Sequence, residues 1–205
     1  MDGQEYLNQI SATNRPAQKS KNGILPSKFF LVGAIGVVAL IIIVVIGLAL
    51  GGGGKGGEKN LSHALYLHLN NTAEEIQEFQ SSVKSSELRS SGASLNGILV
   101  DTSSKLESYL KEKSDFKDKD ISKNIVSDAD LAKDELYNTL FEAKINGNLD
   151  RIFAHTMAYE ITMFMTEENK LINTTKSEDL QNILKTSYDS LDNLYAKFNE
   201  FSETK

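Results

Sequence analysis

The chain has 205 residues, a formal net charge of −6, three histidines, no cysteine and no tryptophan. The lack of cysteine excludes disulfides, zinc–thiolate sites and thiol catalysis. Residues 58–205 hold 17 Lys and Arg against 26 Asp and Glu, a net charge of −9. An acidic domain repels nucleic acids and anionic surfaces, so we expect no nucleic-acid partner.

The first 28 residues form a polar segment that contains both prolines of the chain. Such a composition buries too little apolar surface to fold, which predicts a disordered basic cytoplasmic tail over residues 1–28.

An unbroken apolar run of 22 residues, without a charged side chain, follows at Phe29–Leu50. A helix of this length reaches about 33 Å and covers a bilayer core of about 30 Å. We therefore predict one N-terminal transmembrane helix over residues 29–50, with the lipid bilayer as its partner. A cleaved signal peptide is the alternative, because Gly47 and Ala49 resemble a cleavage site. The apolar run is longer than the usual 7–15 residues of such peptides, which favours a stable anchor.

The orientation of the span follows from its basic flanks. The basic residues before it are Arg15, Lys19, Lys21 and Lys28, and those close after it are Lys55 and Lys59. Because positive flanks tend to stay in the cytoplasm, we expect a single-pass plasma-membrane protein with its N-terminus inside and its C-terminal domain extracytoplasmic.

A glycine tract, GGGGKGG, separates the span from the rest of the chain. Glycine-rich segments behave as flexible coils, so residues 51–58 are predicted to be a flexible linker. The linker tethers the distal domain and argues against a rigid mechanical signal through the span.

Residues 59–205 contain no proline, as expected for long helices. Their apolar residues recur at alternating steps of three and four, which is the pattern of helix bundles. The steps begin at Leu65, Leu88, Ala129, Ala154 and Leu180. We predict an all-α fold in which the span and linker precede an antiparallel bundle of about five long helices. Their expected ranges are roughly 60–84, 86–113, 120–146, 149–173 and 176–203.

Turn residues mark the expected breaks between these helices. Ser85 or Ser86 is suited to cap the second helix, and the Asn146–Asn148 segment supplies a glycine stop. Thr175 and Glu178 have the spacing of a capping box before the last helix. Since the connections are short, consecutive helices are expected to be antiparallel neighbours.

Two glycines, Gly92 and Gly97, lie inside the second predicted helix, where each costs about 1 kcal/mol relative to alanine. These glycines permit either close contact with a neighbouring helix or a bend. The alternative is that the packed helix tolerates them as a local destabilisation.

The histidines and carboxylates give no catalytic or metal-binding pattern. His63 and His68 are five residues apart, about 140° around a helix, and no Glu-x-x-His pair occurs, so neither they nor His155 predict a metal site. Glu160 and Glu168 interrupt apolar helix faces. Neither has a partner histidine to support a general-acid role, so we expect solvated or salt-bridged carboxylates.

Three methionines and two aromatic residues cluster in the segment MAYEITMFM, residues 157–165. Methionines make adaptable contacts and bind soft metals. A helix that is apolar on several faces is more often central in a bundle, which favours a core role.

Several segments occur in a familiar order along the chain. They are Tyr6–Ile10, the basic stretch with its span and glycine tract, Lys84–Ser90, Leu95–Asn96, Asn146–Arg151 and Met157–Glu160. This order resembles a group of uncharacterised single-pass membrane proteins from small-genome candidate-phylum bacteria. The resemblance implies a bacterial envelope location and carries no assigned activity, cofactor or site residue.

These observations predict a membrane-tethered extracytoplasmic helical bundle that acts as a binding or scaffolding module for an envelope protein. They predict no enzyme, no cofactor and no catalytic, cofactor-binding or metal-binding residues. The alternative is a sensor-type bundle that binds a ligand through the Met- and aromatic-rich segment 152–165. An envelope enzyme is the third reading.

Overall fold

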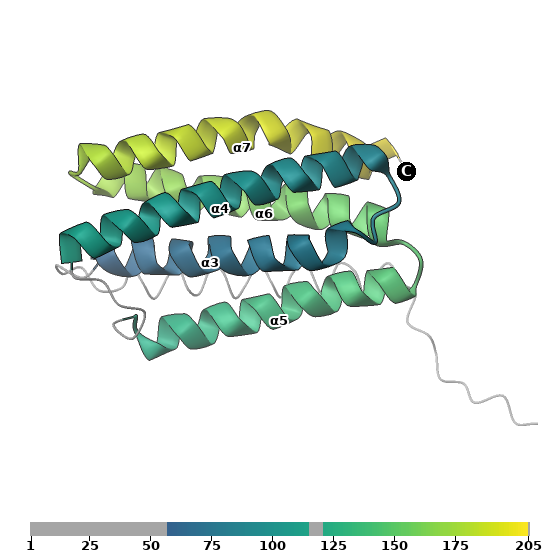
Figure 1. Ribbon diagram of the computed structural model, residues 1–205, viewed down its shortest axis with the longest axis horizontal. Helices are drawn as coiled ribbons and strands as arrows, with labels where there is room; N and C mark the ends of the chain where they lie inside the picture. The colour runs from purple at the N-terminus through teal and green to yellow at the C-terminus, as the bar shows by residue number, and fades with distance from the viewer. Residues whose placement is uncertain (1–56, 115–120, 205) are drawn as a thin grey trace, which may run out of the picture. The chain divides into compact units, whose positions relative to one another are not determined.

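A computed structural model of the chain describes residues 57–114 and 121–204 (Figure 1). The predicted tail, the predicted transmembrane helix and residues 51–56 of the predicted linker lie outside these ranges. Among the described residues, no helix combines the length and hydropathy that a membrane crossing requires.

The described part of the chain is entirely helical, with five helices and no strand. The helices are α3 (Gly57–Gln80), α4 (Ser86–Ser114), α5 (Lys123–Ile145), α6 (Leu149–Thr174) and α7 (Glu178–Thr204). The predicted all-α class and the number of helices in the distal domain are confirmed. Helix α3 begins at Gly57, inside the segment predicted as linker, and ends at Gln80 instead of near residue 84.

Four of the helices form a closed bundle, and the fifth lies outside it. Helix α3 packs against α4, α4 against α7, α7 against α6, and α6 against α3. Helix α5 packs on α3 and α6, and Figure 1 shows it along the side of α3 opposite α4. The expectation that all consecutive helices are neighbours is therefore wrong for α4 and α5, because α5 packs on α3 and α6 instead of on α4.

The core consists of the apolar stripes that the sequence predicts. Leu65, Leu99, Ile161 and Leu184 are each at most 1% exposed and come from the four bundle helices. The stripe of α5 is weaker, because only Ile125, Leu136, Leu140 and Ala143 of this helix are buried. The outer helix is thus held by less apolar surface than the other four.

The breaks between helices follow turn chemistry with one exception. The Ser85 hydroxyl accepts a hydrogen bond from the Leu88 amide at 3.3 Å, as predicted for a cap. Gly147 has φ +71°, the left-handed conformation that ends helices at glycine, so the predicted stop is confirmed. The predicted capping box at Thr175 is wrong. Thr175 ends α6, and the Ser177 hydroxyl accepts from the Leu180 amide at 3.4 Å at the start of α7.

The connection between α3 and α4 is tied to the first turn of α6. The Asp150 carboxylate accepts hydrogen bonds from the backbone amides of Lys84 and Ser85, both at 2.8 Å. The Arg89 guanidinium donates to the Val83 carbonyl at 2.8 Å on the same connection. The sequence segments around Lys84–Ser90 and Asn146–Arg151 therefore meet in the fold.

Gly92 allows a close approach between α4 and α6. A Cβ at this position would lie 3.2 Å from the Phe153 ring, whereas one at Gly97 would meet nothing within 4 Å. The close contact between α4 and α6 accounts for the glycine at position 92. At position 97, glycine is tolerated as a local destabilisation of α4.

Candidate binding site beneath α5

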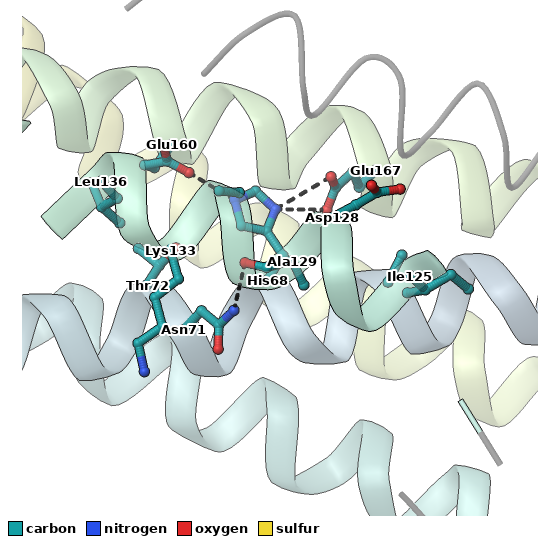
Figure 2. Close-up of a pocket in the computed structure, with 12 residues that line it drawn as sticks. His68, Asn71, Thr72, Ile125, Asp128, Ala129, Lys133, Leu136, Glu160 and Glu167 are labelled. Atoms are coloured by element: carbon teal, nitrogen blue, oxygen red, sulfur yellow. Dashed lines mark hydrogen bonds and ion pairs between the residues drawn. The ribbon is translucent and has the colours of Figure 1, made fainter. Parts of the chain in front are cut away.

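Helix α5 covers a cavity on α3 and α6, with a volume of about 30 Å³. Two alanines of α5, Ala129 and Ala132, face it, and their short side chains leave the space open. The charged residues that line it are His68 from α3, Asp128 and Lys133 from α5, and Glu160 and Glu167 from α6 (Figure 2). Packed protein cores contain few voids, so a cavity lined by several charged side chains is a distinctive feature of this fold.

A partly buried histidine bridges two buried glutamates in this cavity. His68 Nε2 lies 2.8 Å from Glu160 Oε2, and His68 Nδ1 lies 3.1 Å from Glu167 Oε2 (Figure 2). Glu160 and Glu167 are seven residues apart, so both lie on one face of α6. Phe164 lies between them in the sequence, and its ring packs against the His68 ring with centroids 4.3 Å apart. We call His68, Glu160 and Glu167 the carboxylate–imidazole cluster.

The cluster favours the charged form of the histidine. Burial lowers the pKa of His68, but the charge of Glu167 and the hydrogen bonds to Glu160 and Glu167 outweigh burial and raise the pKa to about 10. His68 is therefore an imidazolium at neutral pH, and each ring N–H donates to a different carboxylate. Glu160 is 1% exposed and Glu167 is 7% exposed, so both carboxylates are shielded from water, whereas 13% of the His68 side chain is exposed.

Two polar contacts join α5 to α3 at the edge of the cavity. The Asn71 amide donates to the Ala129 carbonyl at 3.0 Å (Figure 2). The Lys133 ammonium forms an ion pair with Glu74, and this hydrogen bond is the main cause that raises the pKa of Lys133. These contacts hold α5 over the cluster where apolar packing is sparse.

Glu168 lies next to Glu167 in the sequence but belongs to a different environment. It is 0% exposed, and neither carboxyl oxygen has a hydrogen-bond partner within normal geometry among the described residues. Burial raises the pKa of Glu168 to about 8, and the Ser187 hydroxyl opposes that shift only in part. The Ser187 oxygen itself accepts from Thr102 at 3.0 Å. Glu168 is thus a neutral acid in the core at pH 7, and the expectation of a solvated or salt-bridged carboxylate is wrong for it.

The expectation that Glu160 lacks a partner histidine is also wrong, whereas the expected salt bridge of this carboxylate is confirmed by its contact with His68. His68 is 92 residues away in the chain, and only the packing of α3 on α6 brings the two together. The seven-residue spacing of Glu160 and Glu167 on an apolar helix was a signal that both carboxylates face a common partner. The other two histidines do not line the cavity. His63 is buried in α3, and His155 is exposed on α6.

The methionine cluster does not line the cavity. Met157 is fully buried, in agreement with the core role that the sequence favours for this segment. Met165 instead borders an open groove between α6 and α7, together with Tyr188 and Tyr195, with a volume of about 370 Å³.

The carboxylate–imidazole cluster is not arranged as a metal centre. Within the part of the chain that the structure describes, no group of three or more His, Asp or Glu side chains could hold a metal ion. The reason is geometric, because the two ring nitrogens direct Glu160 and Glu167 to separate edges of the imidazole. No protein-family model, curated protein or solved structure matches this chain, so its own geometry carries the functional argument.

Proposed function

We propose that this chain is a binding module tethered to the bacterial plasma membrane. In this proposal, Phe29–Leu50 anchors the chain and residues 59–205 lie on the extracytoplasmic side. The apolar run and its basic flanks in the sequence support the anchor and its direction.

The observation that carries the binding function is the carboxylate–imidazole cluster, with its two buried carboxylates, in the cavity beneath α5. Buried charges are costly and replacing an ion pair by apolar residues is often neutral or stabilising, so stability alone gives little reason to keep this cluster. Polar groups that converge on a cavity are the usual features of a small-ligand site. The weakly packed α5 supplies one wall of that site and offers a way to open it.

The tether has a direct test in intact cells. Protease added outside should remove residues 59–205 and spare the tail at residues 1–28. Protection of the C-terminal domain would overturn the proposed orientation.

The binding function has a test by thermal unfolding of the full-length chain in mild detergent. Small envelope metabolites are screened for a rise in Tm, because a ligand that binds only the folded state stabilises it. Ala132→Leu fills the cavity, whereas Leu131→Gln alters the neighbouring exposed residue on the outside of α5. A Tm rise lost in Ala132→Leu and kept in Leu131→Gln supports the proposal, and a flat screen refutes it.

A sensor-type bundle is the second candidate, favoured by the open groove that Met165 borders between α6 and α7. A ligand in that groove would still raise the Tm of Ala132→Leu. The same screen therefore separates the two candidates.

A further inference from the structure

The carboxylate–imidazole cluster has unequal numbers of acidic and basic groups. Two carboxyl groups, Glu160 and Glu167, share a single imidazole, His68. When all three are charged, the cluster carries one negative charge in excess. An unbalanced charge out of contact with water is strongly unfavourable, so the cavity favours an added cation or proton.

The other charged groups that line the cavity do not supply the missing positive charge. Helix α5 contributes Asp128, which adds a negative charge, and Lys133, which is already paired with Glu74 of α3. On α3, the neutral side chains of Asn71 and Thr72 complete the polar lining. The whole site is therefore rich in acceptors and negative in charge.

The size of the cavity limits the cation. A water molecule needs about 10–15 Å³ of cavity volume, so about 30 Å³ holds two water-sized groups. One nitrogen and one carbon fit this space, and a quaternary ammonium ion with four methyl groups does not.

Resting on the binding function proposed above, we infer that the cavity beneath α5 binds a small primary alkylammonium ion. Its N–H groups donate to the Glu167 carboxylate, and its carbon packs against Ala129 and Ala132. Charge-assisted N–H···O⁻ bonds are about twice as strong as neutral ones, which favours an ammonium group over a neutral molecule of the same size.

The test uses the full-length chain in mild detergent and methylammonium chloride as the probe. Backbone amide NMR shifts are followed during the titration. With two non-hydrogen atoms, methylammonium has an expected Kd of about 5–10 mM or weaker. Tetramethylammonium chloride at the same ionic strength is the control, since it carries the same charge but is too large to enter.

Two variants complete the test. Glu167→Gln removes the excess charge and should raise the Kd at least about tenfold, as expected for a lost charge-assisted bond. Ala132→Leu keeps every charge but fills the cavity, so it should abolish saturable binding. This variant keeps the inference testable if Glu167→Gln does not fold.

Saturable shifts with methylammonium, absent with tetramethylammonium and in Ala132→Leu, support the inference. Equal responses to both cations would reveal only ionic strength and overturn it. No response to methylammonium also overturns it, and the metabolite screen then decides the proposed function separately. A hit in that screen that Ala132→Leu removes would keep the binding function with a different ligand class.

Discussion

Raising the pH from 6.5 to 10 should destabilise the folded chain through His68. The pKa of His68 rises from 6.5 to about 10 on folding, so between these values the folded state binds more protons than the unfolded state. The stabilisation is fully present below pH 6.5 and is lost as the pH rises through 10. The expected slope is about 1.4 kcal/mol of unfolding free energy per pH unit, and the total is at most about 5 kcal/mol.

Other buried groups act in different pH windows. The pKa of Glu168 rises to about 8 and that of Glu75 to about 6, so ionisation of these acids lowers the stability of the fold as the pH rises from 4.5 to 8. The pKa of Tyr159 rises to about 12, which places its effect above pH 10. The interval from pH 8 to 10 is therefore where His68 should dominate.

The assay is urea unfolding of the full-length chain in mild detergent at pH 6, 8, 9 and 10. His68→Gln should lower the unfolding free energy by about 3–5 kcal/mol at pH 6, because it leaves two buried carboxylates without a cation. It should also flatten the slope between pH 8 and 10. His155→Gln is the matched control, since His155 is exposed on α6 and should leave both unchanged. An equal slope in wild type and His68→Gln would refute the charged cluster.

Three further predictions concern packing and buried acids. Gly97→Ala should raise the unfolding free energy by up to about 1 kcal/mol, because a Cβ there meets no other atom. Gly92→Ala should lower the unfolding free energy by about 1–3 kcal/mol, because its Cβ would press on the Phe153 ring. Equal thermal unfolding of the two variants would contradict the close contact at Gly92. Asp150→Asn should cost about 1–3 kcal/mol, because a charged acceptor of two backbone amides is lost, and an unchanged Tm would argue against that link. Glu168→Gln should make the fall in stability between pH 4.5 and 8 shallower; the same slope as wild type in urea titrations would show that Glu168 does not ionise in this range.

The helices could be predicted from the sequence because their signals are local. Spacing of three and four residues placed the stripes that begin at Leu65, Leu88, Ala154 and Leu180 in the core, and glycine chemistry placed the stop at Gly147. Each of these signals depends on residues within a few turns of one another, where helix geometry is fixed.

The position of α5 and the carboxylate–imidazole cluster could not be predicted in this way. A weak stripe identifies α5 as a helix but does not say which two helices it packs on. His68 and Glu160 meet only because α3 and α6 are adjacent, and apolar stripes do not specify that pairing. The seven-residue spacing of Glu160 and Glu167 indicates carboxylates on one face of an apolar helix, but the two carboxylates singled out from the sequence were Glu160 and Glu168 instead. The partner of Glu160 and Glu167 on α3 depended on the packing order.

The most direct test of the central proposal is to locate the bound ligand on the fold. Amide NMR shifts of the full-length chain, titrated with methylammonium, should change around His68 on α3, along Ile125–Lys133 on α5 and near Glu160 and Glu167 on α6. Shifts confined to Tyr188–Tyr195 of α7 would place binding in the α6–α7 groove and contradict the account. An absence of saturable shifts would contradict the ammonium site beneath α5.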